Sequence, residues 1–203
     1  HEPASKDIIN AWVNENTNGK IPTILDEISP DEVMFLINAI YFKGNWKYTF
    51  NEENTTTATF YGEDGTTSDY ERMYMETELP YFQNDLFEAV DLAYGAEDMY
   101  SMTVFLPKEG KNVHDIVNAL DGDAWTDWTS GLSMNQMTFM MPKFKLEYEK
   151  TLNQTLIDLG MGIAFTESAD FSKIANANLY ITKVKHKTFI EIDELGTEAA
   201  AVT

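Results

Sequence analysis

VMFLINAIYF, residues 33–42, is the stretch of sequence that decides the fold. The run is almost unbroken in apolar residues and rich in strand formers, and Gly44 and Asn45 end it. A strand with one face in water would alternate apolar and polar residues, so this run predicts a strand covered on both sides. Asn38 lies in its centre, where an unpaired amide would cost roughly 1–3 kcal/mol. We therefore expect Asn38 to have hydrogen-bond partners elsewhere in the chain.

The residues before and after this run predict a mixture of helices and short strands. Residues 8–13 place apolar side chains on one helical face, and Gly19 follows the polar stretch that ends this helix. From residue 55 to 106, several short strands are separated by turn signals such as those at 62–65 and 94–95.

The second half of the chain continues the mixture. Short amphipathic helices are predicted at 113–120 and 125–128, followed by one long strand at 137–149. Pro142 lies inside that strand, which indicates an edge or a bulge. A capping box then predicts a helix at 151–160.

Residues 182–192 alternate between two faces, with Phe189 as the exception, and predict a half-exposed strand. The face expected to point inward carries Thr182, Val184, His186, Thr188, Ile190 and Ile192, and the outer face carries Lys183, Lys185, Lys187, Glu191 and Asp193. Because buried polar groups are normally paired, we interpret His186 as a hydrogen-bonded core histidine rather than a ligand or a base.

The segment ELGTEAAAVT, residues 194–203, allows two interpretations. By propensity alone it favours the start of a helix or a frayed tail, because alanine is a poor strand former. The alternative is a mobile segment whose small side chains can enter the interior of a sheet, with Gly196 supplying backbone freedom at its root.

The composition excludes several classes of protein. With 14 basic and 34 acidic residues, the net charge of −20 repels phosphate backbones and disfavours heparin-like polyanions. The absence of cysteine excludes disulfides, thiolate catalysis and Cys-ligated zinc. No apolar run approaches the ~20 residues that span a bilayer. No linker-like stretch divides the chain, which predicts one domain.

The sequence contains no constellation that indicates an enzyme. Of its three histidines, we expect His1 and His114 to lie on the surface. The Asp/Gly pairs at 63–65 and 121–123 lack the spacing of a calcium loop and fit turns better. Chance carboxylate pairs keep open a distant alternative, an acidic β-rich hydrolase.

The segment 194–203 resembles the proximal hinge of the reactive-centre loop in the serpin family of protease inhibitors. Further motifs similar to this family occur in its order along essentially the whole chain. They are INAWV at 9–13, TNGKI at 17–21, LINAIYFKGNW at 36–46 with Phe50, Leu106-Pro107, Met141-Pro142-Lys143-Phe144, Leu159-Gly160-Met161 and Ala169-Asp170-Phe171-Ser172.

The resemblance implies an α+β fold with a large, mainly antiparallel central sheet, two smaller sheets and surrounding helices. Residues 1–203 would form a single serpin domain that is incomplete at both ends, running from helix F to the hinge. The expected partners are the remainder of the same chain and a target protease, of the serine class or less often the cysteine class.

The resemblance also assigns three groups of site residues. Asn38 and His186 match the shutter, where each is expected to be the other's hydrogen-bond partner. Trp46, Lys143 and Glu194 match the breach, where Lys143 and Glu194 are expected to form an ion pair. The hinge comprises Gly196, Thr197, Glu198, Ala199, Ala200, Ala201, Val202 and Thr203.

The function implied is a suicide substrate, not an enzyme. The protease attacks the loop, the hinge inserts into the central sheet, and the protease is trapped; residues 1–203 alone are expected to inhibit nothing. A non-inhibitory serpin, acting as carrier, chaperone or storage protein, is the alternative. No metal, cofactor, nucleic acid or membrane partner is expected. The family resemblance suggests an extracellular or cell-surface location, which the residues themselves do not indicate.

Overall fold

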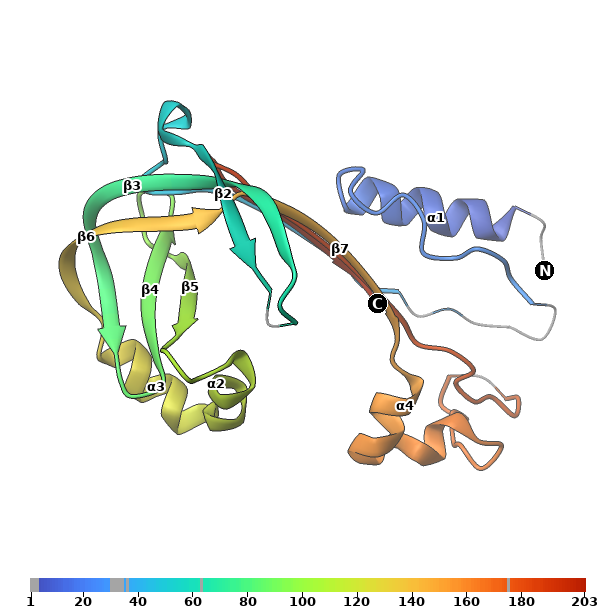
Figure 1. The fold of residues 1–203 in the computed structure, drawn as a ribbon. Helices are drawn as coiled ribbons and strands as arrows, with labels where there is room; N and C mark the ends of the chain where they lie inside the picture. Colours follow the sequence, from blue (N-terminus) through green and yellow to red (C-terminus); the bar gives the residue numbers. More distant parts are fainter. Residues whose placement is uncertain (1–3, 30–34, 36, 63, 175) are drawn as a thin grey trace. The chain divides into compact units, whose positions relative to one another are not determined.

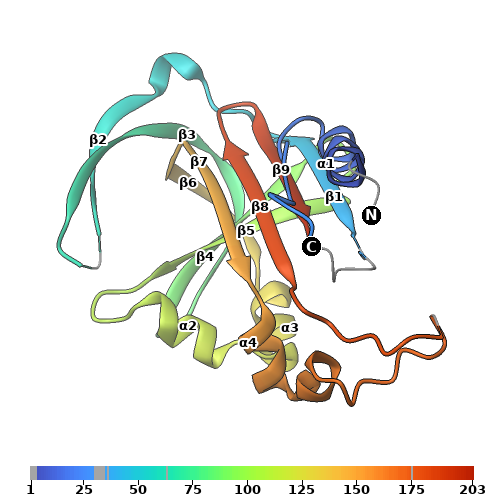
Figure 2. The ribbon, with the colours of Figure 1, turned by 90° about the vertical axis from the view of Figure 1, so that its right-hand side faces the viewer.

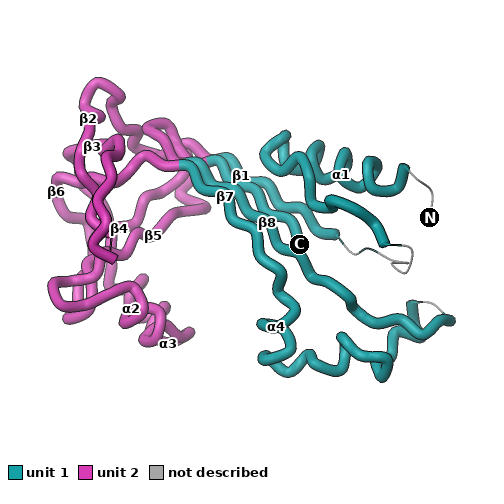
Figure 3. The backbone as a smooth tube through the Cα atoms, turned by 45° about the vertical axis from the view of Figure 1, so that its right-hand side comes forward, with its two compact units in different colours: residues 1–43, 145–191, 198–203 teal, residues 44–144, 192–197 magenta. Residues whose placement is uncertain are grey.

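A computed structural model of the chain describes residues 4–29, 35, 37–62, 64–174 and 176–203 (Figure 1). It contains two compact units, coloured separately in Figure 3. Unit 1 comprises residues 1–43, 145–191 and 198–203, and unit 2 comprises residues 44–144 and 192–197. The single domain expected for residues 1–203 stays a prediction.

Unit 1 contains most of a four-stranded sheet in the order β1-β9-β8-β7 (Figure 2). The turn Asp193–Leu195 joins β8 to β9, so these two strands form a hairpin. Reciprocal backbone hydrogen bonds between Asn38 and Thr203 show that β9 runs antiparallel to the chain leading into β1. The strands are β1 (Ala39–Asn45), β7 (Phe144–Thr151), β8 (Lys185–Ile192) and β9 (Gly196–Val202).

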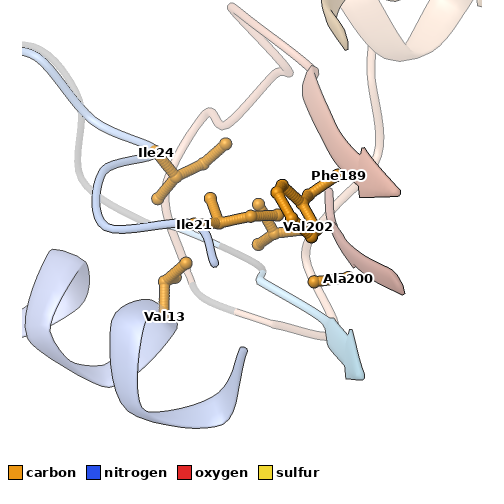
Figure 4. Close-up of a cluster of buried hydrophobic side chains, with 6 residues drawn as sticks. All are labelled: Val13, Ile21, Ile24, Phe189, Ala200 and Val202. Atoms are coloured by element: carbon orange, nitrogen blue, oxygen red, sulfur yellow. The ribbon is translucent and has the colours of Figure 1, made fainter. Parts of the chain in front are cut away.

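The helix α1 (Ser5–Asn16) and the segment after it cover one face of this sheet. The predicted helix is therefore present, but only part of its apolar face is covered: Val13 is fully buried, whereas Ile8 is 62% exposed. Figure 4 shows the core side chains of the layer. They are Val13, Ile21, Ile24, Phe189, Ala200 and Val202.

Both faces of β8 are partly covered, so the predicted division into an inner and an outer face is wrong: Ile192 on the predicted inner face is 2% exposed, and Phe189 on the other face is 3% exposed. Phe189 points into the core against α1, and Lys187 on the same face donates to the carbonyl of Thr23. The lysines can lie on a covered face because carboxylates neutralise them: Lys185 and Lys187 both pair with Glu149. The alternation indicates two faces, but it does not indicate that both of them are partly covered.

The strand predicted at 33–42 is shorter than expected. It begins at Ala39, and the part of the prediction at 33, 34 and 36 lies outside the described residues. Ala39 and Tyr41 pack against the core of unit 1, whereas Ile40 is 58% exposed. Within the described residues this strand is therefore covered on one face, not on both.

Unit 2 contains a five-stranded sheet built around the 17-residue strand β3. All its pairings are antiparallel: β3 pairs with β2 at its start, with β6 along its middle and with β4 at its end. Strands and turns are present between 55 and 106 as predicted, and Gly65 and Gly95 have positive φ, but β3 is a long strand rather than one of the expected short ones. The 3-10 turn η1 (Glu52–Asn54) precedes the strands β2 (Thr56–Tyr61), β3 (Thr67–Gln83), β4 (Phe87–Tyr94), β5 (Tyr100–Pro107) and β6 (Ser133–Pro142).

The predicted helices α2 (Val113–Ala119) and α3 (Gly122–Ser130) are also present. Phe87 is fully buried, and its ring meets those of Phe105 and Trp128 edge-on at centroid distances of 4.9 and 4.7 Å. Aromatic pairs in this geometry add stabilisation beyond the area that they bury. This cluster is the core between the helices and strands β4 and β5.

The long strand predicted at 137–149 is instead two strands, β6 and β7, in different sheets. The chain leaves β6 after Pro142, and Lys143 lies between the two strands, where its backbone N–H donates to the carbonyl of Glu71 at 2.8 Å.

The helix predicted at 151–160 is also irregular. The regular helix α4 covers only Asn153–Leu156, and η2 (Ile157–Met161) and η3 (Gly162–Phe165) follow. The expected capping box is absent from it. Gly160 breaks the helical path with φ of 97°.

Replacing Phe87 with alanine should lower the free energy of unfolding of the protein by about 3–5 kcal/mol, because it removes the centre of the aromatic core. Denaturant-induced unfolding measures this loss. The control is Leu106→Ala, because Leu106 lies on the neighbouring strand but is 65% exposed. Equal losses for both variants would contradict the assignment of this core.

Candidate functional site

Residues 196–202 of the predicted hinge form β9, which lies between β1 and β8 with strands on both sides (Figure 2). The helix or tail that propensity favoured at 194–203 is therefore wrong for this structure. Alanine's weak preference against strands is overridden here because both edges of the segment pair with backbone. The interpretation as a segment that enters a sheet agrees with this position.

The side chains of β9 alternate between two environments. On one face, Ala200 and Val202 contribute to the core against α1, and the Glu198 side chain is 16% exposed. On the other face, Thr197 is buried, Ala199 and Ala201 are half-buried, and Thr203 is exposed. Small side chains on both faces let the segment fit without displacing its neighbours.

Gly196 is required for a different reason from the one expected. Its backbone is not in the left-handed region. A Cβ atom at this position would lie 2.1 Å from the carbonyl oxygen of Gly44 and 2.8 Å from Cα of Asn45. Gly196 therefore permits the close approach of two strands rather than an unusual backbone angle.

Glu194 lies in the turn between β8 and β9 and is only 3% exposed. Its carboxylate accepts a hydrogen bond from Thr55 Oγ1 at 2.7 Å and pairs with Lys143 Nζ at 3.0 Å. Burial favours the neutral carboxyl, but the hydroxyl of Thr55 and the ammonium of Lys143 outweigh it and lower the pKa of Glu194. The structure thus brings together the expected partners, Lys143 and Glu194.

Trp46 lies on the other side of the same turn. Its ring stacks on that of Tyr94 at 4.6 Å, and its Nε1 donates to the carbonyl of Asp193 at 3.0 Å. The hydroxyl of Tyr94 donates to Thr197 Oγ1 at 2.7 Å. Trp46 and Tyr94 thus form an aromatic platform that contacts both the turn and the first buried side chain of β9.

Asn38 and His186 do not form the direct pair that we expected. No hydrogen bond joins their side chains in the described part of the chain. Both instead contact Thr203: Asn38 through reciprocal backbone bonds, and His186 through Nδ1 at 2.6 Å from Thr203 Oγ1. The reason is the strand between them, because strands on either side of a third are about 10 Å apart.

Sequence reasoning did not identify Tyr94 or Thr55 as part of this site. Tyr94 was one of ten tyrosines and Thr55 lay in a threonine-rich stretch, so neither gave a distinguishing signal. The surface position of His114 is confirmed, and His1 lies outside the described residues. Within the described ranges, no group of His, Asp and Glu side chains could hold a metal, and no helix is long and apolar enough to cross a membrane.

The protein belongs to the serpin family. The sequence profile described as Serpin (serine protease inhibitor) matches residues 1–203. Iripin-2 from Ixodes ricinus is 37% identical over 203 residues, which cover 98% of this chain and 51% of that protein. Intracellular coagulation inhibitor 2 from Tachypleus tridentatus is 35% identical over 202 residues, 98% of this chain and 49% of that protein. The chain thus spans about half the length of these curated relatives.

Solved serpin structures show the same fold. The thermophilic serpin tengpin in its latent state has a TM-score of 0.88 and 36% identity, and the match covers 98% of this chain and 55% of that one. Reactive-loop-cleaved human thyroxine-binding globulin has a TM-score of 0.91 and 27% identity, with 98% and 59% covered. The expected fold, α+β with antiparallel sheets and surrounding helices, is confirmed as a partial serpin fold.

Replacing Glu194 with glutamine should destabilise the protein by about 1–3 kcal/mol, because it removes the charge of a buried acceptor from its half-buried partners Thr55 and Lys143. Thermal unfolding of the wild type and the variant measures this loss. The control is Asp98→Asn, the same chemical change in the exposed ion pair of Asp98 with Lys47, which should cost under about 1 kcal/mol. Equal losses would argue against a stabilising pair at Glu194.

The effect of Glu194→Gln should also depend on pH. Because the folded-state pKa of Glu194 is below its ordinary value of 4.5, its contribution is fully present above that value and is lost as the pH falls through the folded-state pKa. The difference in melting temperature between wild type and variant should therefore shrink on acidification below pH 4.5. A difference that stays constant down to strongly acidic pH would contradict this origin.

Proposed function

We propose that the protein is an inhibitory serpin that traps a protease by inserting its reactive-centre loop into the central sheet. The observation that carries the proposal is the position of residues 196–202 as β9, between β1 and β8. Their small side chains and close backbone approach support a segment suited to insertion. Serpins are generally protease inhibitors rather than enzymes, which is consistent with the absence of a catalytic constellation.

In the proposed mechanism the protease supplies the chemistry. Its nucleophile, a serine hydroxyl in the favoured case, attacks a peptide carbonyl in the loop beyond Thr203 and forms an ester as the new amino terminus leaves. Insertion of β9 then precedes hydrolysis of that ester and carries the protease with it. The gain in backbone hydrogen bonds along both edges of β9 drives the change.

The contacts of β9 suggest how its two ends are secured. At the first end, the turn containing Glu194 is held by Lys143 and Thr55, so the strand begins at a fixed point. At the other end, Thr203 bonds to Asn38 and His186. With β9 out of the sheet, β1 and β8 could approach each other, and we propose that Asn38 and His186 then bond directly.

A non-inhibitory serpin is the second candidate. The match to thyroxine-binding globulin supports it, because that protein is a family member named for the molecule that it binds. Thr197 and the alanines favour inhibition, since none of them opposes burial. The two candidates differ in a measurable product, a protease complex that survives denaturing gel electrophoresis.

We propose that the target protease belongs to the serine class. We keep an extracellular location as a proposal by family resemblance, although one relative carries the word intracellular in its name.

Replacing Thr197 with arginine in the full-length protein should convert the inhibitor into a substrate. Thr197 is 4% exposed and hydrogen-bonded to Tyr94, so a charge there would cost several kcal/mol in the inserted state. We expect gel-stable complexes with wild type and only the cleaved form with the variant. The control is Leu195→Arg: Leu195 is 55% exposed, so this variant should keep the complex. A stable complex with Thr197→Arg would refute the need for insertion at this residue.

A further inference from the structure

The carboxylate of Glu198, inside β9, meets a set of side chains that the proposed mechanism does not use. Its Oε1 accepts a hydrogen bond from Tyr41 at 2.5 Å and a longer one from Asn18 at 3.4 Å. Its Oε2 pairs with Lys20 at 3.0 Å and with Lys43 at 3.7 Å. We call Asn18, Lys20, Tyr41 and Lys43 the Glu198 receptor.

The receptor comes from two segments that flank β9. Tyr41 and Lys43 are on β1, and Asn18 and Lys20 are in the turn after α1. The donors are also linked to each other, because Asn18 Nδ2 donates to the Tyr41 hydroxyl at 3.1 Å. The receptor therefore joins the covering layer to the neighbouring strand, and the Glu198 side chain is its common acceptor.

The turn that presents the receptor is firmly built. Thr17 is fully buried, its hydroxyl donates to the carbonyl of Val13, and it accepts the N–H of Ile21. Asn18 has φ of 52° and Gly19 has φ of 78°, both in the left-handed region. Asparagine and glycine are the residues that tolerate this region best, so the turn forms at little conformational cost. It directs Asn18 and Lys20 toward β9.

We propose that the Glu198 receptor binds this carboxylate as β9 enters the sheet and holds the strand there. Lys20 is the residue of the receptor that positions the carboxylate. The inference rests on the proposed function, because it assigns a role in loop insertion. Its distinctive claim is that the receptor stabilises the loop-inserted state more than the state with the loop outside. Among the described residues, the partners of the Lys20 ammonium outside β9 are Glu191, at 3.3 Å, and the ring of Phe189, 4.9 Å from its centroid.

The electrostatics of Glu198 agree with this geometry. The hydroxyl of Tyr41 is the main cause that lowers its pKa, burial opposes the shift, and Lys20 and then Lys43 add to it, so that the pKa falls to about 2. The carboxylate is therefore ionised and paired across the physiological range. Since this pKa lies below the ordinary 4.5, the stabilisation is complete above 4.5 and is lost as the pH falls toward 2.

Lys187 provides a matched control for Lys20. The two side chains are 28% and 24% exposed, each forms ion pairs, and each lies on the covered side of the sheet. Lys187 pairs with Glu149 and bonds the carbonyl of Thr23, neither of which is on β9. Lys20→Met and Lys187→Met therefore remove equivalent charges, one directed at the inserted strand and one not.

The test compares the melting temperatures of the intact and the loop-cleaved full-length protein for each variant. A metalloprotease, which forms no acyl-enzyme, is used for cleavage, so that insertion is measured without trapping. Wild type should gain stability on cleavage. Lys20→Met and Glu198→Gln should each reduce that gain by a few degrees, and the double variant should lose little more than either alone. Lys187→Met should lower both melting temperatures equally and leave the gain unchanged, and Lys20→Arg should restore most of it.

Three results would overturn the inference: an equal effect of Lys20→Met on both states, additive losses in the double variant, or no gain in cleaved wild type. The proposed function is judged separately, by whether wild type forms a gel-stable complex with a serine protease. A normal gain without any such complex would refute inhibition and leave the receptor standing. A gel-stable complex, together with a rise in melting temperature on cleavage that does not depend on Lys20, would refute the proposed role of the receptor and leave the proposed inhibition standing.

Discussion

The structure depends on one constraint: β9 is a strand with a neighbour along each of its edges. Backbone N–H and C=O groups in such a position must be paired on both sides, so the segment must be extended and in register along its whole length. The local features of the hinge follow from this requirement. Gly196 lets the backbones of β9 and β1 approach, and the alanines avoid displacing packed neighbours.

The register of β9 is fixed by polar groups on its two opposite faces. Thr197 bonds to Tyr94 on one face, and Glu198 bonds to Tyr41 and Lys20 on the other. A slip by one residue would exchange these two side chains between faces, which would leave a buried carboxylate without its cations. Apolar alanines could not enforce this choice, because an alanine fits either face. The polar residues therefore specify the register, whereas the small ones permit the strand.

Part of the fold and of the candidate site was predictable from the sequence. Each feature that was not predictable has its own physical reason. The first helix and the glycine turns follow from local patterns and are present, whereas the 17-residue length of β3 does not follow from them. The coverage of both faces of β8 was not predictable, because alternation cannot reveal that Glu149 neutralises two lysines on one of them. Glu194 and Lys143 could be paired only through the family resemblance, because they lie far apart in the sequence. The partners of Tyr94 and Lys20 are set by tertiary structure alone, so no local pattern indicates them.

The weak local preference of the hinge for a strand is consistent with the proposed function. A segment rich in valine and isoleucine would be a better strand, but it would also favour the inserted form, or aggregation, before any protease arrived. The residues 196–201 instead have little strand preference of their own, so the sheet neighbours and the anchors at Glu194, Glu198 and Thr203 supply the stability of β9. Such a segment is stable as a strand only where these partners surround it. In the proposed mechanism, the partners of these anchors lie outside the segment, so the same sequence can be exposed in one state and buried in the other.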